Sequence, residues 1–109
     1  MERVHGIGGF FFRARDPEGL ANWYSQHLGV SPVPADYEHD PWQQEARPTV
    51  FAPFRLDTSY FGRPDQMWMI NFRVRNLAAM VAQLQNAGTA VEVDPETYPN
   101  GLFARLQDP

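Results

Sequence analysis

The chain contains no cysteine, so disulfide bridges and thiolate metal sites are both excluded. It also contains no lysine, because all nine basic residues are arginine. This absence excludes Schiff-base chemistry through lysine and a lysine-bearing phosphate loop. The arginines are scattered and the net charge is −4, so no basic stripe indicates nucleic acid as a partner.

Long apolar runs are absent as well. No run approaches the ~20 residues that span a bilayer. The first residues, Met1 to His5, lack the basic start and the long apolar segment of a signal peptide. We therefore predict a cytoplasmic protein without a membrane partner, and a length of 109 residues indicates a single domain, 1–109.

Residue types that carry catalysis are scarce. The three histidines, His5, His27 and His39, form no His-x-His or His-Glu-x-x-His pattern. No serine lies in a Gly-x-Ser-x-Gly motif. His5 could be a displaced metal ligand and His39 lies in an acidic loop, but exposed positions explain both more simply. The sequence therefore identifies no catalytic residue, and whether the protein is an enzyme stays open at this point.

The chain repeats one pattern about sixty residues apart. Residues 12–16 (Phe-Arg-Ala-Arg-Asp) match residues 72–76 (Phe-Arg-Val-Arg-Asn). After each run, apolar residues recur at helical spacing until a glycine, Gly29 or Gly88. A module used twice can form a cleft between its copies. Asp16 and Asn76 are the expected helix N-caps, and the expected strands are 7–14, 30–34, 49–54, 67–74, 90–93 and 102–107.

Alternation along the first strand of each copy predicts which side chains lie under the helices. Phe12 should pack against Trp23 or Tyr24. Phe72 should pack against Val81 or Leu84. The opposite face carries Phe11 in the first copy and Met69 in the second, which should meet across the cleft.

Several runs carry a family resemblance. Residues 6–17, with Trp23-Tyr24 and His27-Leu28-Gly29, resemble the opening of the vicinal oxygen chelate superfamily, which includes glyoxalase I, bleomycin-resistance proteins and extradiol dioxygenases. Residues 57–62 and 69–74 are similar to its small bacterial members. The resemblance covers essentially the whole chain, and it specifies the fold better than the reaction.

The resemblance implies an α+β fold of two βαβββ modules whose curved sheets enclose a cleft. Module one would cover about 4–54, a connector 55–66 and module two 67–109. The last strand of module two would lie beyond Pro109. A missing strand leaves an open sheet edge that invites pairing with another chain, so we expect a homodimer.

The resemblance also implies one metal ligand seven residues before each helix-capping residue. These positions hold Gly9 and Met69, neither of which suits a hard divalent cation. The strand 49–54 should supply another ligand but contains no His, Asp or Glu, and the remaining Glu would lie beyond Pro109. We therefore predict no metal and no cofactor.

Side chains that face the cleft in this geometry are aromatic, thioether or amide groups, which suit a flat and mostly apolar molecule. The alternative is that they fill a small core. Arg13 and Arg73 occupy matching positions and could bind an anion, although a structural ion pair is the simpler reading. The predicted ligand-binding residues are Phe11, Trp42, Tyr60, Met67, Met69, Asn71 and Arg105.

Two function classes follow. The first is a metal-free protein of the bleomycin-resistance type that binds a small aromatic molecule. The second is a metal-dependent lyase of the glyoxalase type, or a dioxygenase, with its metal ligands at unexpected positions. Gly9 and Met69 favour the binding protein.

Overall fold

Both predicted helices are present in the computed structural model, which describes residues 1–109. Helix α1 covers Pro17–Leu28 and follows Asp16, whose side chain accepts a hydrogen bond from the Gly19 amide at 3.0 Å. The helix ends at Gly29, which has a left-handed backbone (φ 70°) that costs glycine little. The local signals read from the sequence therefore set both ends of α1.

Helix α2 covers Leu77–Asn86 and begins in the same way. The Asn76 side chain accepts a hydrogen bond from the Ala79 amide at 3.0 Å, and Gly88 beyond the helix has a positive φ of 86°. Leu84 on this helix is the only fully buried side chain of the chain, at 2% exposed. The predicted caps are thus confirmed in both copies of the repeat.

Replacing either cap should measure what these hydrogen bonds contribute. We expect Asp16→Ala and Asn76→Ala each to lower the free energy of unfolding by ~1 kcal/mol, because a backbone donor of the first turn loses its acceptor. Urea unfolding followed by circular dichroism measures the change. Asp16→Asn, which keeps an acceptor oxygen, is the matched control. A large loss of ligand affinity with unchanged stability would show that the residue serves a binding site instead.

The sheet consists of two short antiparallel strands, β1 (Glu92–Val93) and β2 (Ala104–Arg105). Glu92 lies opposite Arg105, and Val93 lies opposite Ala104. Tyr98 and Gly101 form an additional bridge in the connection between the strands. Both strands fall inside the ranges expected from the sequence, 90–93 and 102–107, but are shorter.

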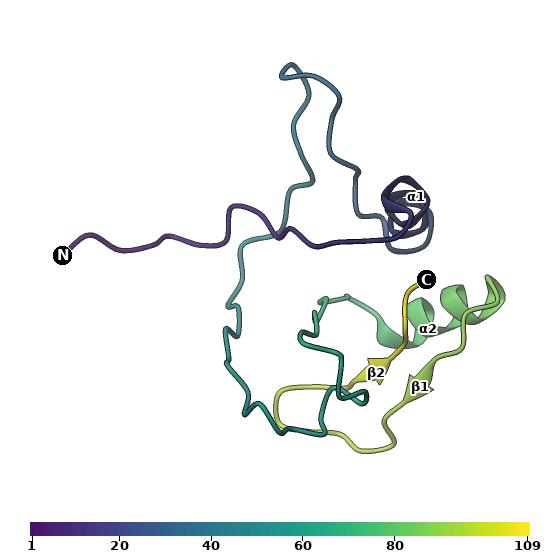
Figure 1. Ribbon diagram of the computed structural model, residues 1–109. Helices are drawn as coiled ribbons and strands as arrows, with labels where there is room; N and C mark the ends of the chain where they lie inside the picture. The colour runs from purple at the N-terminus through teal and green to yellow at the C-terminus, as the bar shows by residue number, and fades with distance from the viewer.

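The other expected strands do not pair with one another through backbone hydrogen bonds. Residues 7–14, 30–34, 49–54 and 67–74 lie outside the sheet, so the layout of two βαβββ modules is not confirmed and stays a prediction. Alternation of side chains indicates which residues share a face, but a strand also needs a hydrogen-bonded partner, which no local pattern specifies. Figure 1 shows the N-terminal segment running as an extended chain away from the two helices.

The chain is more open than a compact domain of its length. Its radius of gyration is 15.8 Å, against about 13 Å for a compact domain of about 109 residues. Most large apolar side chains outside the helices are correspondingly exposed. Neither helix is long and apolar enough to cross a membrane.

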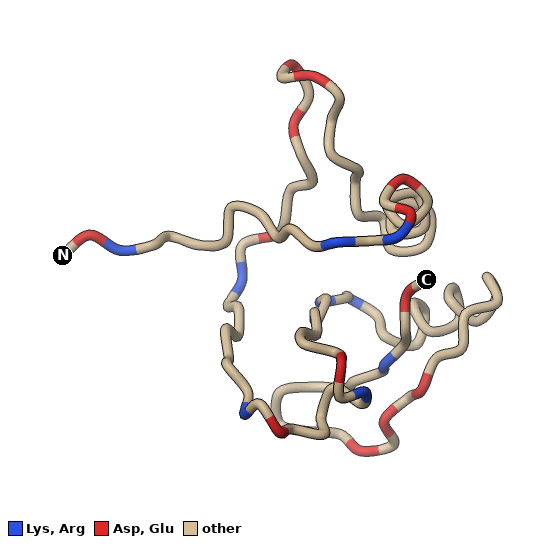
Figure 2. The backbone as a smooth tube through the Cα atoms, in the orientation of Figure 1, with Lys and Arg blue, Asp and Glu red and all other residues tan.

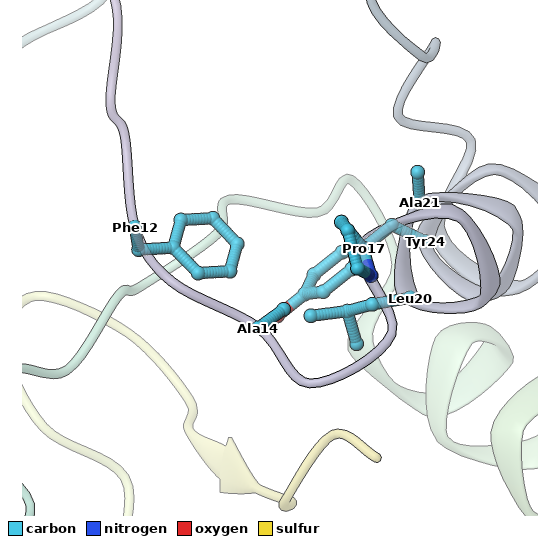
Figure 3. Close-up of a pocket in the computed structure, with 6 residues that line it drawn as sticks. All are labelled: Phe12, Ala14, Pro17, Leu20, Ala21 and Tyr24. Carbon is cyan, nitrogen blue, oxygen red and sulfur yellow. The ribbon is translucent and has the colours of Figure 1, made fainter.

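The matching segments of the repeat nevertheless lie together through aromatic contacts. The Trp68 ring lies 5.1 Å from Phe10 and 5.3 Å from Phe12, between ring centroids. Phe12 also borders a hollow of about 120 Å³ with residues of α1, including Tyr24, and its ring is directed toward that helix (Figure 3). Phe11 is 92% exposed. Phe12 therefore lies beside α1, and its predicted packing against Trp23 or Tyr24 stays a prediction.

Candidate functional site

Two predicted ligand-binding residues, Tyr60 and Arg105, are in direct contact. The guanidinium carbon of Arg105, on β2, lies 4.2 Å from the centroid of the Tyr60 ring. One guanidinium nitrogen also donates a hydrogen bond to the Tyr60 carbonyl at 3.0 Å. The cation thus lies over an aromatic ring, an attractive arrangement that holds the arginine in place.

Further aromatic rings extend this contact into an aromatic platform, defined here as Phe54, Tyr60 and Phe61 with Arg105. The Phe54 and Tyr60 rings are stacked, with centroids 5.4 Å apart and an interplanar angle of 24°. Phe61 lies 5.1 Å from Phe54. Phe54 and Tyr60 are about half exposed, so the platform is open to a flat ligand.

Asp94 and Tyr98 form a hydrogen-bonded pair after β1. The Tyr98 hydroxyl donates to Asp94 at 2.8 Å, and the Glu96 amide donates to Asp94 at 3.0 Å. The amide of Glu96, followed by the Tyr98 hydroxyl, lowers the pKa of Asp94, and the bond to Asp94 raises the pKa of Tyr98. At neutral pH the carboxylate is therefore ionised and the phenol is protonated, so neither group is prepared to exchange a proton.

The other predicted ligand-binding residues do not join the platform. Trp42 lies against Phe72, with ring centroids 6.3 Å apart. Phe72 also contacts Tyr24 of α1, with ring centroids 6.1 Å apart. Its predicted packing against Val81 or Leu84 stays a prediction. The remaining predicted residues, all exposed, are Phe11, Met67, Met69 and Asn71. Their part in ligand binding stays a prediction.

A hollow of about 310 Å³ between α2 and the sheet was not predicted as a site. Leu77 and Val81 of α2 face Val93 and Leu102 across it, and Asp94 lies at its border. The apolar spacing on α2 indicated this face, but as part of a core rather than as an open hollow.

The metal centre implied by the resemblance does not fit the donors of this chain. Gly9 and Met69 stand at the two positions that the sequence analysis assigned to metal ligands, and no three His, Asp or Glu side chains gather closely enough to hold an ion. His39 instead lies 2.8 Å from Asp36 within one loop. The metal-free state itself remains a prediction.

Three arginines surround Glu45, and sequence reasoning identified only one of them. Arg75 forms an ion pair with the Glu45 carboxylate, Arg47 lies 3.9 Å from it, and Arg73 donates a hydrogen bond to the Glu45 carbonyl at 3.0 Å. We call Arg47, Arg73 and Arg75 the basic cluster. Arg13, the repeat mate of Arg73, forms no ion pair. The alternation Arg73-x-Arg75 could have indicated two guanidiniums on one side of an extended segment.

Comparison with known proteins identifies the family. A family model described as a glyoxalase-like domain matches residues 9–109. Neither a search of curated proteins nor a search of solved structures gave a significant match. Because the matched region is nearly the whole chain, this protein belongs to the glyoxalase-like proteins of the vicinal oxygen chelate superfamily.

Proposed function

We propose that the chain is a metal-free binding protein of the bleomycin-resistance type that holds a flat, mostly apolar small molecule. The observation that carries this proposal is the residue pair Gly9 and Met69, which stand at the positions that the resemblance assigns to metal ligands. Neither offers the hard oxygen or nitrogen donor that a catalytic divalent ion needs. The aromatic platform supplies a stacking surface with one polar group, Arg105, which suits such a ligand.

The protonation states support binding over acid–base catalysis. Six groups have displaced pKa values, and all six move away from neutrality. Hydrogen bonds lower the pKa values of Asp36, Asp65 and Asp94, and the pKa values of Arg63, Tyr24 and Tyr98 are raised. For Tyr24 the largest cause is burial. A general acid or base works best with a pKa near the working pH, and none of these groups meets that condition.

The proposal includes a homodimer. The chain exposes 10293 Å² and has a mass of 12.5 kDa, whereas a folded monomer of this mass exposes about 6200 Å². The excess of exposed surface includes apolar side chains on extended segments, such as Phe11 and Phe51, which are 92% and 85% exposed. A second copy that pairs with these segments would cover this surface.

A metal-dependent lyase or dioxygenase is the second candidate, favoured by the match to a glyoxalase-like domain. In that case the ligands would include residues at unexpected positions, with His5 at the start of the first extended segment as the first to test.

Elemental analysis and a neutral probe separate the two candidates. We expect no stoichiometric Ni²⁺, Zn²⁺, Fe²⁺ or Mn²⁺ in the purified protein, because the donor set is missing. We also expect 2-naphthol to bind with an affinity that treatment with a chelator does not change. Quenching of tryptophan fluorescence follows the titration.

The same experiment can overturn the proposal. One divalent ion per chain, removable together with an enzymatic activity, would establish the metal-dependent alternative. His5→Ala would then show whether His5 is a ligand. Absence of any naphthol binding by metal-free protein would exclude the binding function as stated.

A further inference from the structure

The guanidinium of Arg105 has hydrogen-bond donors to spare. It donates one hydrogen bond, to the Tyr60 carbonyl at 3.0 Å, and it forms no ion pair. A guanidinium carries five N–H donors in one plane, so most of those of Arg105 remain free. They are available to an acceptor group on a molecule at the aromatic platform.

Two contacts with one residue fix the position of these donors. The hydrogen bond to the Tyr60 carbonyl holds one end of the guanidinium, and the Tyr60 ring lies 4.2 Å from its central carbon. The Tyr60 ring is also stacked with Phe54, at 5.4 Å between centroids. Arg105 is therefore held next to the two half-exposed rings on which a flat ligand can lie.

Two carboxylates accompany the single guanidinium. Glu92 lies directly opposite Arg105 in the antiparallel pair of strands, which places such side chains about 5 Å apart at their β-carbons. The Glu96 amide and the Tyr98 hydroxyl lower the pKa of Asp94, and the nearby charge of Arg105 adds to this effect. Figure 2 shows the acidic positions of β1 and the following loop beside one basic position on β2. Negative charge is therefore in excess around Arg105.

From these contacts we infer that the ligand is an uncharged, flat aromatic molecule that carries a carbonyl group. Its ring lies against the aromatic platform, and its carbonyl oxygen accepts a hydrogen bond from Arg105. This inference rests on the proposed function, since it specifies the chemical class of the small molecule bound at the platform.

The local charges favour a carbonyl over a carboxylate. Both groups can accept a hydrogen bond from Arg105, but a carboxylate also meets the like charges of Glu92 and Asp94. Like charges at this separation repel each other, and the repulsion is moderate because the groups are partly hydrated. Arg105 therefore selects for an acceptor, and the two carboxylates select against an anion.

Two probes of nearly the same shape test the hydrogen bond. In 2-acetonaphthone a carbonyl oxygen takes the place of the methylene group of 2-isopropenylnaphthalene. Arg105→Met keeps an unbranched side chain over Tyr60 but removes every donor. We expect it to weaken binding of 2-acetonaphthone about fivefold, the loss of one hydrogen bond, and to leave binding of 2-isopropenylnaphthalene unchanged. Quenching of tryptophan fluorescence follows both titrations.

Arg63→Met is the matched control. Arg63 lies two positions after Phe61 of the platform, but its guanidinium is already paired with Asp65 through hydrogen bonds of 2.9 and 2.6 Å. We expect this variant to bind both probes as the unmodified protein does.

A second variant tests the selection against anions while Arg105 stays in place. In the unmodified protein, 2-naphthoate should bind about threefold more weakly than 2-acetonaphthone at low salt. Glu92→Gln combined with Asp94→Asn keeps the acceptor oxygens but removes both charges. We expect about fivefold tighter binding of 2-naphthoate by this variant, with binding of 2-acetonaphthone unchanged.

Several results would overturn the inference and leave the proposed binding function standing. Unchanged binding of 2-acetonaphthone by Arg105→Met would exclude the hydrogen bond. An equal loss for both neutral probes would show that Arg105 only supports the rings. Tighter binding of 2-naphthoate than of 2-acetonaphthone by the unmodified protein would exclude the selection against anions. Failure of every probe to bind would overturn the proposed function as well.

Discussion

Leu84→Ala should lower the free energy of unfolding by about 3 kcal/mol, the largest loss expected from one substitution in this chain. Leu84 is 2% exposed, and no other side chain is fully buried. It lies in the last turns of α2, where its carbonyl also accepts hydrogen bonds from the Ala87 and Thr89 amides. Truncation removes apolar contacts and leaves a cavity, whereas the helix itself is kept, because alanine favours it.

Urea unfolding followed by circular dichroism measures this effect, and Leu56→Ala is the matched control. Leu56 is 91% exposed, so the same substitution there should change stability by less than about 0.5 kcal/mol. Similar losses in the two variants would show that Leu84 is not the centre of the core.

The sequence predicted the local features of the fold well. The side chains of Asp16 and Asn76 accept the expected hydrogen bonds, and Gly29 and Gly88 have the expected positive φ. Each of these features depends on residues within four positions of one another. Such short-range contacts follow from residue type alone, so a sequence is enough to place them.

Pairing between distant segments was predicted less completely. Only one expected strand pair formed, and it joins neighbouring segments of the chain, 92–93 and 104–105. The runs 7–14, 49–54 and 67–74 alternate as strands should, but alternation does not identify the segment with which each pairs. For this reason the family match supports a fold that the pattern of residues alone could not specify.

The residues of the candidate site were likewise predicted only in part. Tyr60 and Arg105 were both predicted to bind the ligand, and the structure places them in contact although they are 45 positions apart. The basic cluster was missed, apart from the suggestion that Arg73 could bind an anion. Its geometry depends on Glu45, which is 30 positions from Arg75 and carries no local signal of that contact.

Phe72→Ala and Phe11→Ala should separate packing from ligand binding. Phe72 is half-buried and contacts Tyr24 and Trp42. Its truncation should lower the free energy of unfolding by about 2–3 kcal/mol, below the ~3–5 kcal/mol typical of a fully buried aromatic side chain. Phe11 is 92% exposed, so its truncation should cost less than about 0.5 kcal/mol.

Ligand affinity should respond in the opposite way. If Phe11 forms one wall of the ligand site, Phe11→Ala weakens binding of 2-naphthol while stability stays nearly constant. Urea unfolding and the fluorescence titration, applied to both variants, measure the two effects separately. A large loss of stability in Phe11→Ala, with little loss in Phe72→Ala, would contradict this assignment. The odd-numbered residues of these segments would then pack in the core, and the even-numbered residues would face the ligand. Gly9 shares a face with Phe11, so its assignment to the family's metal position would then be wrong as well.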